Sequence, residues 1–393
     1  MTRHVFLLAA ASAAILSLHA SSAIAAPRIP ASGTEVLERL PARNDPAQQA
    51  LATARAQLAA DPRNPVLAAA VARRYVTLAR GDADPRYLGY AQAALAPWWN
   101  EPVPPPPVQL LRATILQSTH QFPAALRDLD HLVQTTPGDA QAWLTRATVL
   151  QVTGDFAGAR QSCAKLFGIA PDLVLRTCLA EVGSVTGAAN ASYQALRRTY
   201  AARRPDDASI ADWVLTLLAE MAARLGDATA AETHFREALA LGPADSYLLG
   251  AYADFLLDRK RAAEVVPLLR GHEKADALLL RLGLALQATG APDTAKVTAL
   301  LRDRFDAAAL RGDTVHQREQ ARFELVLNRQ PARAIELAKR NWAVQKEPAD
   351  LRILLESAIA AHDRAGIDTV RAWVAQTKIE DVAIARLLAG VPK

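Results

Sequence analysis

The chain has few aromatic residues and almost no sulfur chemistry. Of its 393 residues, 5% are aromatic, two are cysteine and two are methionine. The motifs H-E-x-x-H, G-x-S-x-G, G-x-x-x-x-G-K-[ST] and G-x-G-x-x-G are all missing. The sequence therefore lacks the usual signatures of metalloproteases, α/β-hydrolases, P-loop nucleotidases and dinucleotide-binding enzymes. We expect a protein without catalytic activity, metal or cofactor.

A surplus of one charge is also missing over most of the chain. The 45 basic and 40 acidic residues occur in mixed order and leave a net charge of +5. No basic stripe stands out, so nucleic-acid binding has little support despite a pI near 9.3. The charges are better interpreted as solvated helix faces.

Long apolar runs are absent except at the N-terminus. Arg3 precedes an apolar stretch, Val5–Leu18, and small residues then lead to an A-x-A pattern at Ala23–Ala25. The apolar stretch is shorter than the roughly 20 residues that a membrane-spanning helix needs. The pattern is typical of a secretory signal peptide, so we expect cleavage after Ala25. A periplasmic or secreted mature chain without a transmembrane segment would follow.

The two cysteines are Cys163 and Cys178. An even number of cysteines in an exported protein permits a disulfide. A redox or metal-binding pair has little support, because there is no C-x-x-C. Two alternatives remain, a disulfide and two buried free thiols.

Two segments of the sequence are similar to each other. "RATILQSTHQF" (112–122) and "RATVLQVTGDF" (146–156) are offset by 34 residues. Residues at matching places around the two segments and in a third unit are Gln109, Ala113, Leu116, Ala125, Leu129, Pro137; Trp143, Ala147, Leu150, Ala159, Cys163, Pro171; and Leu215, Leu218, Ala219, Ala222, Ala231, Phe235, Pro243. In both period and pattern, the chain resembles the tetratricopeptide repeat family.

This resemblance implies an all-α fold, a right-handed α-solenoid of stacked antiparallel helical hairpins. Alanine occupies the places where two helices cross closely, and large apolar residues fill the space beside them. A single hairpin cannot bury its own apolar face, so neighbouring hairpins must stack. Two departures predict irregularity: Arg112 and Arg146 stand where the pattern has Leu, and residues 172–205 are one residue out of phase.

The expected organisation has six parts. They are a signal peptide (1–25), an extended lead-in (26–44), N-terminal repeat-like helices (45–100), a Pro-rich spacer (101–107), core repeats (108–275) and divergent C-terminal hairpins with a capping helix (276–393). The spacer "EPVPPPP" could instead be a polyproline ligand for a partner. A stiff spacer is favoured, because recognisable repeats resume immediately after it.

The resemblance also implies a concave groove lined by the first helix of each hairpin. We expect the exposed positions there to be Leu110, Thr114, Gln117, Leu144, Thr148, Gln151, Trp213, Thr216, Glu220, Tyr247 and Asp254. Thr and Gln recur in register in the first two units, which suggests a polar ladder for an extended peptide or a partner helix. The alternative is duplication without selection for binding.

A second candidate surface lies near the C-terminus. It contains Arg318, Arg322, Asn341 and Trp342 on two adjacent helices, where pairing within the protein is the alternative.

These features predict a non-catalytic scaffold of the cell envelope that binds another protein. The alternative is a glycan-associated module serving envelope polysaccharide export or cell-wall assembly. Its support is the possible exposure of Trp98, Trp99 and Trp213, for which core packing is the more ordinary interpretation.

The first prediction concerns processing. Mass spectrometry of the protein from the periplasm should find a chain that begins at Ala26 or within a few residues of it. Intact Met1 on protein from the cytosol would contradict export.

Overall fold

The computed structural model describes Ser32 and residues 46–391. The predicted signal peptide, and the lead-in apart from Ser32, lie outside the described residues. The chain divides into two units, residues 1–49 and residues 50–393. Residues 50–393 form one compact unit, which holds every helix except the first residues of α1.

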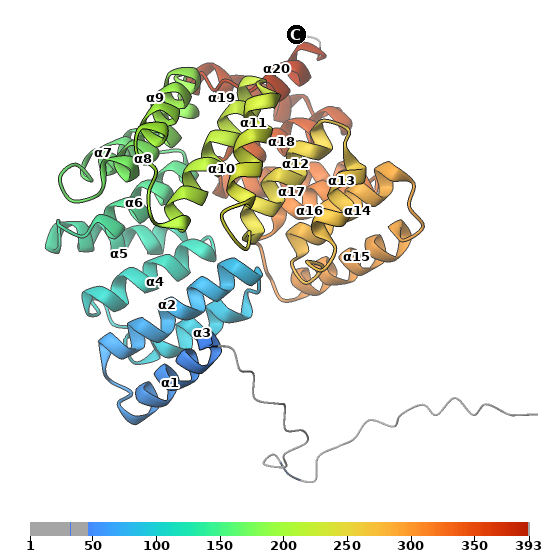
Figure 1. Cartoon of the computed structure of the whole chain (residues 1–393). Coiled ribbons are helices and arrows are strands. Elements are labelled where there is room, and N and C mark those ends of the chain that lie inside the picture. The colour runs from blue at the N-terminus through green and yellow to red at the C-terminus, as the bar shows by residue number, and fades with distance from the viewer. Residues whose placement is uncertain (1–31, 33–45, 392–393) are drawn as a thin grey trace, which may run out of the picture. The chain divides into compact units, whose positions relative to one another are not determined.

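The described part of the chain is helical and contains no strand (Figure 1). The first helices are α1 (Pro46–Ala60), α2 (Pro65–Asp82), α3 (Arg86–Ala94), α4 (Pro106–Ser118), α5 (Phe122–Thr135), α6 (Ala140–Thr153), α7 (Phe156–Ala164), α8 (Asp172–Ser184), α9 (Ala189–Ala202) and α10 (Ala208–Leu225). The others are α11 (Ala228–Leu239), α12 (Ser246–Asp258), α13 (Ala262–Leu269), α14 (Asp276–Thr289), α15 (Thr294–Leu310), α16 (Gln317–Arg322), α17 (Pro331–Val344), α18 (Pro348–Ala360), α19 (Arg364–Thr377) and α20 (Val382–Ala389). A π-helical turn, η2 (Phe323–Leu327), continues α16.

Consecutive helices pair into hairpins that stack in chain order. The pairs α4/α5, α6/α7, α8/α9 and α10/α11 pack closely, and each second helix contacts the next first helix. Aspartate caps begin several of these helices; Asp155, for example, accepts a hydrogen bond from the Gly158 N–H of α7. Gly154 and Gly226 end first helices with positive φ, which glycine adopts without steric cost. The predicted all-α solenoid with tetratricopeptide-like hairpins is confirmed.

Alanines occupy the crossing points as the pattern predicted. Ala113, Ala147 and Ala219 on first helices are buried, as are their second-helix partners. The out-of-phase segment nevertheless forms a regular hairpin, α8/α9. Gly183 supplies the small residue there, because a Cβ at this position would lie 2.3 Å from Ser192 Oγ.

The arginines that depart from the pattern tie the two helices of a hairpin together. The Arg112 guanidinium donates to both carboxylate oxygens of Asp128, at 2.8 and 2.6 Å. Its third nitrogen donates to the carbonyls of Trp98, Trp99 and Glu101, which holds the Pro-rich spacer against α4. Arg146 Nη1 donates to Ser162 Oγ at 2.7 Å. In both hairpins the arginine therefore reaches the residue 16 positions later.

A disulfide joins Cys163 of α7 to Cys178 of α8. It links two consecutive hairpins rather than the two helices of one hairpin. The bonded residues are 15 apart in sequence, and a loop of that length contributes about 3 kcal/mol by restricting the unfolded chain.

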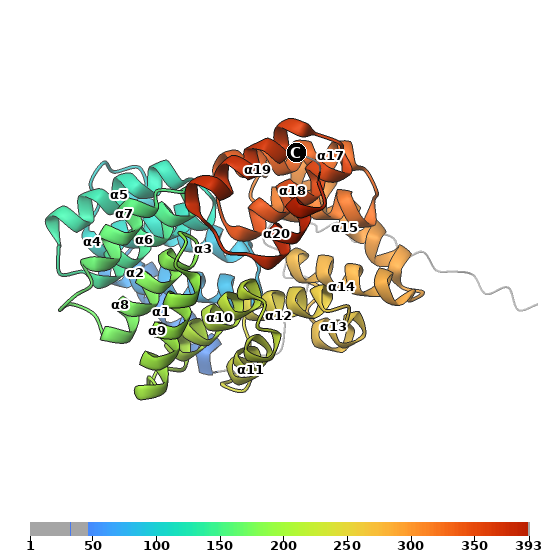
Figure 2. The ribbon, with the colours of Figure 1, turned by 90° about the horizontal axis from the view of Figure 1, so that it is seen from above.

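The C-terminal hairpins pack back against the turns of earlier hairpins (Figure 2). The Lys346 N–H donates to the Val152 carbonyl at 2.8 Å, and Trp373 lies beside Phe156 with ring centroids 5.9 Å apart. A Cβ at Gly154 would lie 2.9 Å from Trp373. At another point of the array, Ser246 at the start of α12 donates to the Arg80 carbonyl of α2. The array of residues 50–393 thus closes on itself.

The crossing at Ala147 generates a stability prediction. Ala147→Leu should lower the free energy of unfolding by about 1–3 kcal/mol, because the added carbons have no space between α6 and its neighbours. Denaturant titration would measure it. The matched control is Ala157→Leu at an exposed position of α7, expected to change stability by less than about 0.5 kcal/mol. Equal effects of the two variants would contradict the assigned facing of α6.

Candidate functional site

Polar side chains from several first helices converge on the inner face of the array. Gln151 Nε2 of α6 donates to Glu181 Oε1 of α8 at 3.2 Å. Tyr247 Oη of α12 donates to Glu220 Oε1 of α10 at 3.0 Å. The Lys346 N–H donates to the Val152 carbonyl of α6, which places the link between α17 and α18 beside these helices, and the charges of Glu220 and Glu347 both act on Glu181. We call Glu181, Glu220, Tyr247 and Glu347 the acidic cluster.

The acidic cluster is incompletely neutralised. Burial raises the pKa of Glu181 to about 7, and the charges of Glu220 and Glu347 act in the same direction. Burial also raises the pKa of Glu220. Arg224 lies near both carboxyl groups, but its Nη2 donates to Ser184 Oγ at 2.8 Å. A ligand that carries a positive charge or donates hydrogen bonds would stabilise the ionised forms of these carboxyl groups.

Asp254, next along α12, has the opposite environment. Arg281 and Arg322 donate to its two carboxylate oxygens at 2.6 and 2.5 Å. Burial opposes ionisation of Asp254, but the two guanidinium groups outweigh it and lower its pKa. Arg322 and Asp254 are 68 residues apart in sequence, so their ion pair joins α16 to α12. It fixes the position of α12 next to the acidic cluster.

Arg318 links the acidic cluster to the interior of the C-terminal hairpins. Its Nη1 lies 2.8 Å from Glu347 Oε2 and 3.4 Å from Asp350 Oδ1. Asp350 is fully buried, accepts a hydrogen bond from Asn341 at 2.8 Å and caps α18 together with Glu347. Burial raises the pKa of Asp350 to about 6.

Of the predicted groove positions, Glu220, Tyr247 and Asp254 come together, and Gln151 reaches them through Glu181, but the expected exposure of the predicted positions is wrong in part. Leu110, Thr114 and Thr216 are buried. Threonine hydroxyls bond within their own helices: Thr114 donates to the Leu110 carbonyl and Thr148 to the Leu144 carbonyl. The predicted Thr ladder is therefore satisfied internally. The half-buried predicted positions are Gln117, Leu144, Thr148, Gln151, Trp213, Glu220 and Asp254. Tyr247 is 60% exposed.

The predicted second surface is not exposed. Asn341 and Trp342 are 2% and 8% exposed. Arg318 and Arg322 bond to carboxylates of the same chain, as described above. The alternative, pairing within the protein, is what the structure contains, because the faces of α16 and α17 that carry these four residues pack against each other, α18 and α12.

Sequence reasoning missed Glu181 and Glu347. Glu181 lies in the segment that seemed out of phase, so its position on a first helix was not assigned. Glu347 lies beyond the recognisable repeats, and only the backfolding of the C-terminal hairpins brings it to the inner face. A corrected phase for α8 would have found Glu181; no local signal marks Glu347.

The described residues give little support to a metal site or a membrane-spanning helix, and they form a shallow apolar hollow. Among the described residues, no three His, Cys, Asp or Glu side chains come together as metal ligands. None of the described helices combines the length and apolarity of a bilayer span. A shallow apolar hollow of about 400 Å³ lies between α1, α2 and α3, lined by Tyr75, Tyr90 and Arg55 among others.

Comparison with solved structures finds helical-repeat proteins. The chain is similar to a tetratricopeptide repeat protein from Parabacteroides merdae, with 13% identity and a TM-score of 0.47 over 61% of this chain and 92% of that one. It is also similar to a chain of the APC/C hetero-tetramer Cut9–Hcn1, with 15% identity and a TM-score of 0.44 over 87% and 58% of the two chains. Yeast Tom70 gives 12% identity and a TM-score of 0.31 over 87% and 92%. No protein-family model and no curated protein matches the sequence.

The raised pKa of Glu181 predicts a pH-dependent stability. The folded chain keeps a proton on Glu181 up to about pH 7, whereas the unfolded chain loses it near pH 4.5. Stability should therefore fall as pH rises between these values. Glutamine carries no proton that titrates, so Glu181→Gln removes this loss of stability. The free energy of unfolding of the variant minus that of the native chain should be about 2 kcal/mol larger at pH 8 than at pH 4.5.

Denaturant titrations at the two pH values would test this prediction. Glu336→Gln, at an exposed position of α17, is the control and should show no such gain. A gain that does not change with pH would mean that Glu181 does not titrate in this range.

Proposed function

We propose that the protein is a non-catalytic scaffold of the cell envelope whose inner face binds an extended segment of another protein. The observation that carries the proposal is Tyr247, a tyrosine that remains 60% exposed on a first helix of a repeat array while bonded to Glu220. Amphipathic aromatic side chains in such positions are typical contact residues for protein partners. The helical-repeat architecture supports the same role by analogy.

The chemistry of the acidic cluster specifies the partner segment further. The pKa values of Glu181 and Glu220 are raised by burial and by the charges of neighbouring carboxylates, Glu220 and Glu347 for the first and Glu347 and Asp254 for the second. A Lys or Arg side chain entering between them would favour both ionised forms. The proposed segment is therefore extended and basic.

The envelope location is supported by two separate features. The N-terminal sequence up to Ala25 has the pattern of a cleaved signal peptide. The Cys163–Cys178 disulfide suits an oxidising compartment.

The glycan alternative has weaker support. Trp98 is buried, while Trp99 and Trp213 are half-buried, so a continuous aromatic platform for sugar rings is not formed by these three side chains.

Photo-crosslinking tests the proposal at one residue. A photoreactive phenylalanine at Tyr247 should crosslink in the native envelope to one protein, and the crosslinked peptide should be basic. The control is the same residue at Tyr90, a tyrosine of similar exposure on α3. A synthetic copy of the peptide should bind the native chain and bind Glu181→Gln/Glu220→Gln at least about tenfold more weakly, since each lost charge contact is worth about 1 kcal/mol.

Two results would contradict the proposal. One is crosslinking at Tyr90 but not at Tyr247. The other is a peptide whose affinity does not change in the double variant. Binding of wall-derived oligosaccharides that quenches tryptophan fluorescence and is lost in Trp213→Ala would favour the glycan alternative.

A further inference from the structure

The net charge of the chain is concentrated in one short region. Residues 156–205 contain seven basic and two acidic residues, a surplus of +5 that equals the net charge of the whole chain. The basic residues are Arg160, Lys165, Arg176, Arg197, Arg198, Arg203 and Arg204. Of the two acids, Asp172 pairs with Arg176 at 2.6 Å, and Glu181 belongs to the acidic cluster on the inner face. The exposed Asp206 and Asp207 follow this region directly, so its basic surplus rests on five side chains that no carboxylate among the described residues pairs: Arg160, Lys165, Arg197, Arg198 and Arg203.

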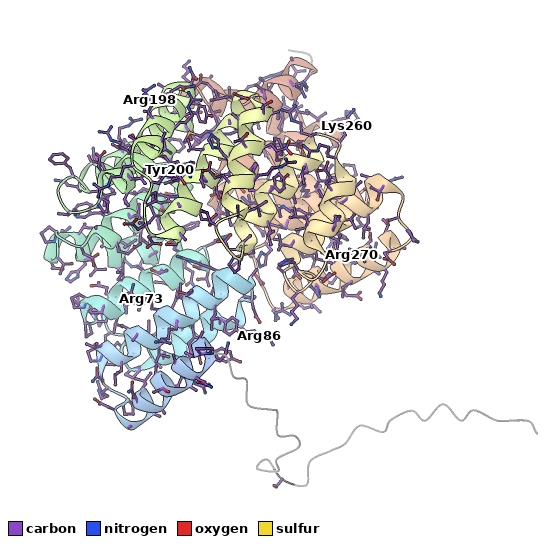
Figure 3. The ribbon with its side chains drawn as sticks, in the orientation of Figure 1. Arg73, Arg86, Arg198, Tyr200, Lys260 and Arg270 are labelled. Carbon is purple, nitrogen blue, oxygen red and sulfur yellow. A yellow bond between two sulfur atoms is a disulfide. The ribbon has the colours of Figure 1, made fainter. Side chains whose placement is uncertain are left out.

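Helix α9 and the two residues that follow it present most of that charge. Arg197, Arg198, Arg203 and Arg204 are exposed, and α9 itself contains no acidic residue. Arg204 pairs with Glu237, but no carboxylate among the described residues pairs with the other three. Figure 3 shows Arg198 at the outer edge of the stack.

Buried tyrosines support two of these arginines. The Arg197 guanidinium lies 5.7 Å from the Tyr193 ring centroid, and that of Arg204 lies 5.4 Å from the Tyr200 centroid. A contact of this kind holds the guanidinium in place, and Arg197, which no carboxylate among the described residues pairs, can still donate hydrogen bonds to an anion.

An apolar tip lies at one end of the same hairpins. Phe167, in the loop between α7 and α8, is 81% exposed, and Ile169 and Lys165 beside it are exposed as well. The disulfide closes this loop, and the fully buried Leu166 anchors it. The Phe167 ring therefore projects from a constrained turn rather than from a free tail.

The apolar tip and the arginines share one end of the α8/α9 hairpin. The two helices pack as consecutive antiparallel elements, so the start of α8 at Asp172 lies at the same end as the last turn of α9 at Ala202. The loop with Phe167 leads directly into α8, and Arg203 directly follows α9. We call Lys165, Phe167, Arg197, Arg198 and Arg203 the basic face.

We propose that the basic face docks the protein on a membrane surface that contains anionic phospholipid. Guanidinium groups bind lipid phosphates in a bidentate manner, and each basic residue near an anionic bilayer adds to attraction. An aromatic ring on a projecting tip enters the headgroup region, which deforms around it, whereas a protein partner would need a matching hollow. The basic face lies outside the array and the acidic cluster lies inside, so docking does not depend on the proposed partner site.

Vesicle co-sedimentation of the mature full-length chain tests this proposal. The chain should bind vesicles of phosphatidylcholine mixed with phosphatidylglycerol and not vesicles of phosphatidylcholine alone. The variant Arg197→Gln/Arg198→Gln/Arg203→Gln should bind the mixed vesicles at least about tenfold more weakly. Phe167→Ser should weaken binding about threefold or more without changing the dependence on salt, because it removes insertion but no charge.

The matched control is Arg311→Gln/Arg340→Gln/Arg364→Gln, which removes the same charge from exposed positions elsewhere. It should bind like the native chain, and thermal melting should show that all variants fold. Equal loss in both triple variants would overturn the basic face as the docking surface. Absence of binding to the mixed vesicles would overturn membrane docking, and binding to polyglutamate instead would assign the face to an acidic protein.

Discussion

The structure depends on one constraint: a helical hairpin cannot bury its apolar face alone. Every hairpin between α4 and α13 therefore relies on its neighbours, and the contact is close because alanine or glycine stands at each crossing. The end of such an array would remain uncovered. Here the C-terminal hairpins fold back onto the turns of α6/α7, α8/α9 and α10/α11, where Gly154 leaves space for Trp373. Closure by the chain itself thus replaces a separate cap, and it also creates the inner face.

The inner face combines two kinds of carboxylate. Asp254 is held between two guanidinium groups, so it stabilises the contact between α12 and α16. Glu181 and Glu220 lack equivalent partners and carry raised pKa values, which is unfavourable for stability. Unfavourable groups of this kind concentrate at functional sites. This difference is why the acidic cluster, and not the paired Asp254 beside it, is the better candidate for binding.

The sequence was sufficient to predict the architecture, because the constraint behind it is local and repeated. The 34-residue period and the alanines at the helix crossings each require the same hairpin, and the hairpins α4/α5, α6/α7 and α10/α11 follow them. The site was predictable only in part. Tyr247 and Glu220 follow from the repeat phase, whereas the role of Glu347 depends on a contact that the chain makes by folding back. Thr114 and Thr148 were misleading, since a threonine hydroxyl can bond to its own helix as readily as to a ligand.

The disulfide gives the turn that carries Phe167 a tolerance to proteolytic nicking. Cys163 and Cys178 stand on either side of the loop that carries Phe167, so a peptide bond cut in this loop leaves both halves of the chain covalently joined. The severed hairpins would remain at an effective concentration of roughly millimolar, at which re-association exceeds escape. An array held together by neighbour contacts would otherwise divide at such a cut. The crosslink thus preserves the continuity of the stack at this exposed turn.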